Sequence, residues 1–247
     1  MPDLPLWKWL LAAFCAFNVG MAKTGMPGLG IMVIPLFVIA VGDARLSAGW
    51  LLPVLITADL FAVFYYRRHA AAGRLFSLLP WVAGGMAAGA YILRYDDRFL
   101  RPLVGVIILS MLIVYLLRKR AVDPLPTDGV FYSAAYGSMA GFATMVANAA
   151  GPVMNVYLLS RRLSREEFVA TGAWFFFVVN LTKIPVYYGH GLFSQASLAF
   201  DLALAPATMA GALAGRKLLA VIPQKVFEVS VIVLAFLATI ALFISGR

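Results

Sequence analysis

The stretch Met145–Asn155, MVANAAGPVMN, lies inside the uncharged run Val130–Ser160, which otherwise has the composition of a membrane segment. It combines an asparagine, a series of small residues and a Gly-Pro pair. Proline lacks the backbone N–H that a helix needs and clashes with the preceding turn, and glycine is a poor helix former. The stretch therefore predicts a break in the helix, with a new helix beginning near Pro152, where the first turn tolerates proline.

The composition around this stretch is that of an integral membrane protein. Of the 247 residues, 63% are hydrophobic and 13% are charged, whereas soluble proteins are about 45–50% apolar and about 25% charged. The net charge of +9 is concentrated in short gaps such as Arg67–Arg68, Arg118–Arg120 and Arg161–Arg162. Basic residues between apolar runs follow the positive-inside rule. This pattern indicates a protein that crosses the lipid bilayer several times, and it excludes nucleic-acid binding.

Eight apolar runs follow one another along the chain. Two of them, Leu10–Val41 and Val130–Ser160, are each about 30 residues long, or ~45 Å as one helix. A single crossing takes about 20 residues, so each long run predicts a broken, re-entrant hairpin, interrupted at Lys23–Gly30 and at Asn148–Pro152. The six other runs fit single crossings: Leu46–Tyr66, Leu75–Leu93, Leu103–Leu117, Phe168–Tyr188, Leu192–Gly215 and Val226–Ile244.

The order of these runs predicts an internal repeat. The polar linker at residues 121–129, AVDPLPTDG, separates a first repeat at residues 1–120 from a second at residues 130–247, and each begins with a broken run. A shift of 121 positions aligns Gly20 with Gly141 and Asp59 with Asn180. Few identities survive this alignment, so the prediction depends on the order of features.

The charged loops predict that the second repeat is inverted. The linker and the basic turn Arg161–Arg165 are both expected in the cytoplasm, whereas the loop around His190 has no Lys or Arg and is expected outside. Both ends of the second hairpin then lie inside, and both ends of the first lie outside. The predicted fold is an all-α polytopic membrane protein with two inverted repeats, each a re-entrant hairpin plus three transmembrane helices. Inverted repeats with broken helices are typical of transporters.

The breaks also predict an anion site. A helix that begins inside the membrane points its free N–H groups and the positive end of its dipole at the membrane interior. Gly28, Gly30 and Gly151 let a ligand approach the backbone closely. The alternative is that the small residues only allow tight helix packing.

Charged residues inside the apolar runs are the second sign of function. Lys23, Asp59 and Lys183 are costly in a membrane, and such residues usually mark functional sites. Two alternatives to a functional role stay open for Lys23 and Lys183. Each side chain could snorkel to a membrane interface, or it could form a structural ion pair with Asp59. Asp59 is either a proton-coupling acid or a structural counter-ion. The sequence contains no enzyme motif such as HExxH, GxSxG or a Walker loop. It has only two His and one Cys, which are not spaced as the ligands of a metal site would be. We therefore predict no catalytic, metal or cofactor site.

Two segments resemble a known family. GMPGLGIMVIP (Gly25–Pro35) is similar to the glycine-rich motif, followed by a proline, of the sulfite exporter TauE/SafE family of membrane transporters. Ala147–Leu192 resembles the second repeat of that family, with a small-residue break and Gly-Pro, a basic turn, and a helix ending in Asn and Lys-x-Pro. The similarity covers nearly the whole chain in order and length.

The resemblance implies a multi-pass secondary transporter of the bacterial inner membrane that exports sulfite or organosulfonates. Its partners would be the small anion and the lipid bilayer, and the sequence leaves open whether transport is coupled to protons or is uniport. A passive anion channel and a carrier for another small organic anion stay open, although polar groups concentrated near the breaks favour a carrier. The anion is expected at mid-membrane, between the N-termini of the two broken helices. The expected substrate ligands are Lys23, Thr24, Gly28, Gly30, Asn148, Ala150, Gly151, Asn180 and Lys183, with Asp59 as the coupling candidate.

Overall fold

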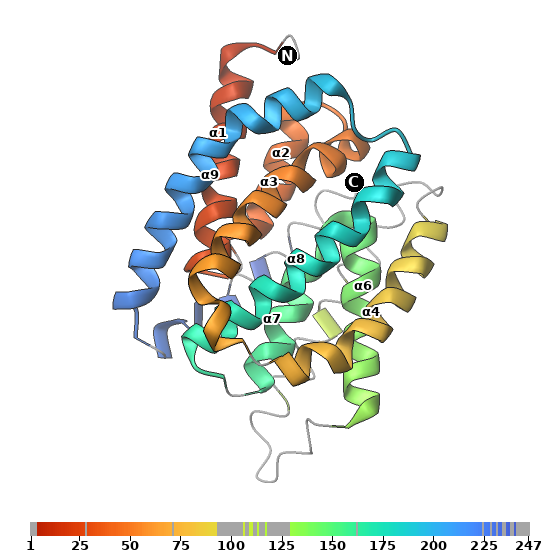
Figure 1. Ribbon diagram of the computed structural model, residues 1–247, viewed down its shortest axis with the longest axis vertical. Helices are drawn as coiled ribbons and strands as arrows, with labels where there is room; N and C mark the ends of the chain where they lie inside the picture. The colour runs from red at the N-terminus through yellow and green to blue at the C-terminus, as the bar shows by residue number, and fades with distance from the viewer. Residues whose placement is uncertain are drawn as a thin grey trace. The chain divides into compact units, whose positions relative to one another are not determined.

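The computed structural model describes residues 4–27, 29–70, 72–92, 129–161 and 163–223, with isolated residues between 106 and 117 and between 225 and 240. Within these ranges the protein is helical and has no strand (Figure 1). The helical class of the prediction is therefore confirmed. The elements are α1 (Leu6–Thr24), α2 (Gly30–Val41), α3 (Ala44–Tyr66), η1 (Arg67–His69), α4 (Ala72–Ile92), α6 (Val130–Ala147), α7 (Ala150–Ser160), α8 (Arg165–Gly189) and α9 (Gln195–Val221).

Both long apolar runs break where the sequence predicts. The first run divides into α1 and α2, and the second into α6 and α7. Helix α7 begins at Ala150, which places Pro152 in its first turn, where the missing N–H costs no helical hydrogen bond. Asn148 ends α6 in the left-handed conformation with φ 52°, which asparagine adopts more readily than most residues.

In the part of the chain that the structure describes, three helices are long and apolar enough to cross a membrane: Leu46–His69, Arg165–Gly189 and Gln195–Val221. A shorter apolar helix covers Ser77–Ile92. These four agree with four of the six predicted single crossings. Only scattered residues of the predicted runs Leu103–Leu117 and Val226–Ile244 are described, so these two crossings stay predictions. Most of the predicted linker at residues 121–129 lies outside the described residues, so the division into two repeats there stays a prediction.

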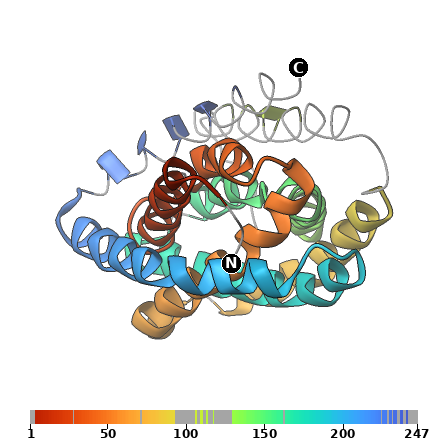
Figure 2. The ribbon, with the colours of Figure 1, turned by 90° about the horizontal axis from the view of Figure 1, so that it is seen from above.

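The chain forms two compact units, and each combines helices from both halves of the sequence. The first unit holds residues 1–70 and 165–223, and the second holds residues 71–164 and 224–247. In the first unit, α1 lies along α9, and α3 packs against α8 and α9 (Figures 1 and 2). In the second unit, α4 packs against α6, and α6 packs against α7.

Glycine allows backbone contact between the paired helices of each unit. In the first unit, a Cβ on Gly20 would lie 2.0 Å from the Thr208 carbonyl oxygen. In the second unit, a Cβ on Gly141 would lie 2.1 Å from the Val82 carbonyl oxygen. Real side chains never approach so closely, so no larger residue fits at either glycine. Small residues at such contacts are the usual means of close helix packing in membranes.

The two helix contacts correspond when α1 is shifted by 121 positions and α4, the partner of α6, by 126 positions, which takes Gly85 to Gly211. Shifting α1 by 121 positions, which takes Gly20 to Gly141, also takes Phe17 to Ser138. A Cβ on Gly211 would meet the Phe17 carbonyl oxygen at 1.9 Å, and one on Gly85 would meet that of Ser138 at 2.0 Å. The same backbone contact therefore occurs once in each unit, which supports the predicted repeat.

Candidate functional site

Three polar side chains meet in the first unit, two of them buried and one, Lys23, 13% exposed. Lys23 Nζ, in the last turn of α1, lies 2.8 Å from Asp59 Oδ1 of α3. Asn180 Nδ2, on α8, donates a hydrogen bond to Asp59 Oδ2 at 2.7 Å. Asp59 is fully buried, and the Asn180 side chain is buried as well. Each oxygen of the carboxylate thus has its own partner, which makes Asp59 a counter-ion in this conformation. The ion pair that was one alternative for Lys23 is present.

Lys183 is the second cation of this cluster. It is fully buried, and its Nζ lies 5.7 Å from the centre of the Tyr187 ring. It interacts electrostatically with both Lys23 and Asp59. Its burial excludes snorkelling to an exposed position. The cluster therefore combines two lysines with one carboxylate.

Helical spacing places the α8 contributions on one face. Phe176, Asn180, Lys183 and Tyr187 recur at the i, i+4, i+7 and i+11 positions, which lie along one side of a helix. The Phe176 ring faces Lys23 Nζ at 3.8 Å from the ring centre. A cation over an aromatic face is stabilised electrostatically where water is excluded. Phe176 and Tyr187 were not predicted, although the same spacing in the sequence could have identified them.

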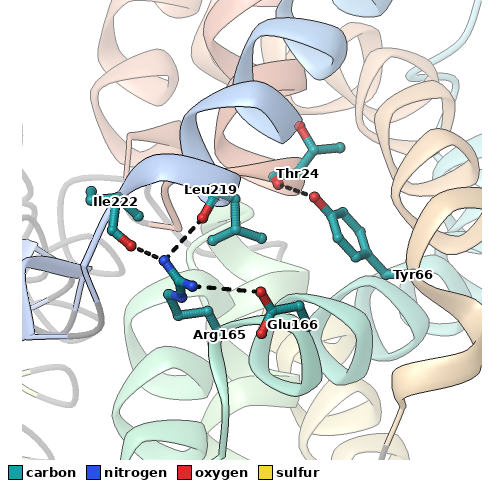
Figure 3. A network of polar contacts seen from close by, with 6 residues as sticks. All are labelled: Thr24, Tyr66, Arg165, Glu166, Leu219 and Ile222. Atoms are coloured by element: carbon teal, nitrogen blue, oxygen red, sulfur yellow. Dashed lines mark hydrogen bonds and ion pairs between the residues drawn. The ribbon is translucent and has the colours of Figure 1, made fainter.

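Polar contacts hold the end of α1 at the first break. The Thr24 hydroxyl donates to the Ala212 carbonyl oxygen at 2.6 Å and contacts that of Gly20 at 3.1 Å. The Tyr66 hydroxyl donates to the Thr24 carbonyl oxygen at 3.1 Å (Figure 3). The last carbonyls of a helix have no partner within it, and freed backbone groups in a membrane need one inside the protein. Tyr66 supplies that partner, whereas the Thr24 hydroxyl joins α1 to α9.

Arg165 links the start of α8 to the end of α9. The Arg165 guanidinium donates to the carbonyl oxygens of Leu219 and Ile222 and lies 3.8 Å from the Glu166 carboxylate (Figure 3). A cation at a helix C-terminus pairs with the exposed carbonyls and the negative end of the dipole. Arg165 therefore fixes where α9 ends. The basic turn of the sequence has this structural role in addition to its predicted role in orientation.

The second break lies in the other unit and leaves space beside its backbone. Neither α7 nor α2 begins with a side-chain cap, so their first N–H groups receive no hydrogen bond from a capping side chain. A Cβ on Gly151 would meet nothing within 4 Å. A Cβ on Gly30, at the start of α2, would touch only Ala22 at 3.6 Å. These glycines are not used for helix packing, in contrast to Gly20 and Gly141.

The structure brings part of the predicted site together. Lys23, Asp59, Asn180 and Lys183 form one cluster in the first unit, where Gly30 also begins α2. Thr24 is directed at α9. Gly28 lies outside the described residues. Asn148, Ala150 and Gly151 belong to the second unit.

One buried charge was overlooked in the sequence. Asp201 interrupts the apolar run Leu192–Gly215 just as Asp59 interrupts its own run, and this signal was available from the sequence. It is on α9 and is 5% exposed. Among the described residues, no group of three or more His, Cys, Asp or Glu side chains is placed to hold a metal ion.

Comparison with known proteins gives one match. The family model described as sulfite exporter TauE/SafE matches residues 10–242, nearly the whole chain. No curated protein and no solved structure matches.

Proposed function

Because the chain belongs to the sulfite exporter TauE/SafE family, we propose that it is a secondary transporter that exports sulfite or organosulfonates across the bacterial inner membrane. The family match over residues 10–242 is the observation that carries this proposal. Three helices able to cross a membrane support a multi-pass protein. The expected substrate is a small oxyanion whose negative charge must be compensated once it leaves water.

The buried cluster supplies that compensation. Asp59 has Lys23 and Asn180 as close partners, and Lys183 adds a second positive charge beside them. Isolated charges away from water cost several kcal/mol each unless paired. An anion bound next to Lys183 could accept charge-assisted hydrogen bonds from its ammonium group, and such bonds to oxyanions are among the strongest in proteins. Lys183 is therefore the proposed substrate ligand, with Asp59, Asn180 and Lys23 positioning it electrostatically.

Backbone donors at the helix breaks are the second proposed element. The first N–H groups of α2 and α7 point along their helix axes and lack side-chain caps. Helix N-termini bind oxyanions well, and the space beside Gly151 leaves room for one. Asn148 and the backbone of Ala150 and Gly151 are proposed to contact substrate in the second unit. Gly30 and the N-terminus of α2 are proposed to do so in the first unit.

The proposed mechanism is alternating access by inverted repeats, with the linker at residues 121–129 in the cytoplasm. Repeat-built transporters move one part of the protein against another so that a site opens to one side at a time. The anion exchanges its water shell for N–H and ammonium donors, and then regains water on the other side. The equivalent glycine contacts of the two units support the repeat part of this proposal.

The test is transport by the purified protein in proteoliposomes. Radiolabelled sulfite inside should leave faster than from protein-free vesicles, and an organosulfonate should compete. Unlabelled sulfite outside the vesicles should accelerate the efflux of labelled sulfite. A carrier changes conformation faster with its site occupied, so outside sulfite speeds its return to the inward-facing state. Flux without such acceleration would indicate a channel, and competition only by unrelated organic anions would indicate another carrier specificity. Lys183→Met should abolish the flux, whereas Lys217→Met, at an exposed position of α9, should not.

A further inference from the structure

Asp201 is a buried carboxylate that has no hydrogen-bond partner among the described residues. It lies on α9 about 9 Å along the helix from Gln195, within the candidate membrane span Gln195–Val221. It is 5% exposed, and neither carboxylate oxygen has a hydrogen-bond partner in the described part of the chain. Most buried polar groups are hydrogen-bonded, so an exception calls for an explanation.

Aromatic side chains close the space around the neighbouring residue. The Phe200 ring centre lies 4.5 Å from that of Trp9 on α1, 5.4 Å from that of Trp50 on α3 and 6.4 Å from that of Phe37 on α2. Three helices thus meet α9 at this level. The layer next to Asp201 along α9 is therefore built of aromatic rings, and Asp201 itself is 5% exposed.

Among the described side chains, the helices packed around Asp201 provide no counter-charge. Helix α9 packs against α1 and α3, and α2 has no charged residue. On α1, Lys8 Nζ lies over the Trp7 ring, and Lys23 is paired with Asp59 of α3. The other titratable residues of α1 and α3 are Cys15, Arg45, Tyr65 and Tyr66, and none of the described side chains hydrogen-bonds to Asp201.

Asp201 is also separate from the lysine cluster. Thr24, the neighbour of Lys23, bonds to Ala212, about 16 Å farther along α9 than Asp201. The two buried aspartates therefore have different surroundings. Asp59 has Lys23 and Asn180 as close partners, whereas an ionised Asp201 would have no partner among the described residues, which is strongly unfavourable away from water.

We propose that Asp201 binds the proton that is coupled to anion transport, an inference that rests on the proposed transport function. An O–H bond forms when the carboxylate takes a proton from water on one side, and the bond breaks when the site opens to water on the other side. A sodium ion fits the site poorly, because hard cations need several oxygen ligands and no described polar group lies within hydrogen-bond distance of this carboxylate. Pro206 removes one helical hydrogen bond within two turns of Asp201, so α9 bends more easily there.

The first test compares coupled and uncoupled transport in proteoliposomes. Asp201→Asn resembles the protonated carboxyl but cannot release a proton. The wild type should accumulate radiolabelled methanesulfonate, whose charge does not change with pH, when a pH gradient is imposed. With Asp201→Asn, methanesulfonate should only equilibrate across the membrane and should not accumulate. The exchange of labelled for unlabelled anion should keep the wild-type rate. The matched control is Asp43→Asn at the exposed N-cap of α3, where asparagine serves equally well.

Accumulation by Asp201→Asn driven by the pH gradient would overturn the proposal. Accumulation that needs a sodium gradient in place of the pH gradient would overturn the assignment of the proton. If the wild type transports neither methanesulfonate nor sulfite, the proposed function fails, and a second measurement still tests Asp201.

That second measurement is pH-difference infrared spectroscopy of the protein in lipid. The wild type and Asp43→Asn should show the band of a protonated carboxyl group in apolar surroundings, and Asp201→Asn should lack it. If Asp201→Asn does not fold, Asp201→Glu should show the band at a shifted position. A wild type without this band, or a band that Asp201→Asn leaves unchanged, would refute the proposal whatever the transport result.

Discussion

Asn180 Nδ2 donates a 2.7 Å hydrogen bond to Asp59 Oδ2, and the two residues lie 121 positions apart. The same shift takes Gly20 of α1 to Gly141 of α6 and the start of α3 close to the start of α8. In the predicted repeat, Asp59 and Asn180 are therefore equivalent positions, and equivalent positions touch where two copies meet, as they do across a two-fold interface. The buried cluster is therefore built at a junction of the two halves of the sequence, from one acidic and one amide side chain.

The first prediction concerns the counter-ion role of Asp59. Asp59→Leu leaves two lysines without a carboxylate, and breaking a buried pair in this way costs about 3–5 kcal/mol. Thermal unfolding in detergent should show a clear loss of stability. Adding Lys23→Met to Asp59→Leu should recover much of it, because the pair is then removed as a whole. A double variant no more stable than Asp59→Leu would show that the two side chains do not depend on each other.

The second prediction concerns Lys183. Lys183→Ala should weaken substrate binding and leave the folded yield nearly intact, because the Lys23–Asp59 pair remains. The loss of a hydrogen bond to a charged ligand is about 1.5–3 kcal/mol, or roughly tenfold to a hundredfold in affinity. Sulfite affinity and thermostability should be measured on the same preparation. Lost stability with unchanged affinity would assign Lys183 to structure.

The third prediction separates the two kinds of glycine. Gly85→Ala and Gly211→Ala each drive a Cβ into a carbonyl oxygen of the opposite helix, and overpacking of this kind costs about 1–3 kcal/mol. Both should lower the unfolding temperature by similar amounts, because the two contacts are equivalent. The control is Gly84→Ala, the neighbour of Gly85, since a Cβ there meets nothing within 4 Å. Equal stability of all three variants would contradict the backbone contacts.

The fourth prediction tests the second break. Gly151→Ala should fold like the parent, because the space beside Gly151 is open, and yet transport less if the anion occupies that space. Gly151→Val should transport still less. Asn148→Ala should reduce transport roughly tenfold to a hundredfold, the effect of one lost hydrogen bond to an anion. Asn148→Gly keeps the left-handed backbone easy to adopt and should show the same defect.

The control for the second break is Cys15→Ala, at a buried packing position of α1, which should leave transport unchanged. If Gly151→Val and Asn148→Ala each transport at the rate of the parent protein, the break between α6 and α7 serves helix packing and does not bind substrate.

The fifth prediction concerns topology. Single cysteines introduced by Thr127→Cys and Ser164→Cys, in a Cys15→Ala background, should both react with a membrane-impermeant thiol reagent from the cytoplasmic side only. The basic residues near both positions place them there by the positive-inside rule. Labelling from opposite sides would rule out the inverted repeats.

Much of the fold was predictable because its signals are local. Apolar runs, the two breaks and the order of the helices follow from composition and from glycine and proline, which act on the backbone within a few residues. The break at Asn148 and the start of α7 near Pro152 are examples. Buried charges such as Lys23, Asp59 and Lys183 were also recognisable, since each interrupts an apolar run. Asp201 gave the same signal.

The partners of these charges were decided only by tertiary structure. The sequence left Asp59 open as a coupling acid or a counter-ion, and packing of α1, α3 and α8 placed Lys23 and Asn180 against it. The same packing directed the Thr24 hydroxyl to α9 and left Asp201 without a hydrogen-bond partner among the described residues. Such contacts join residues far apart in the chain and depend on how closely helices approach. Composition and periodicity determine what each segment becomes, whereas helix packing determines which side chains meet.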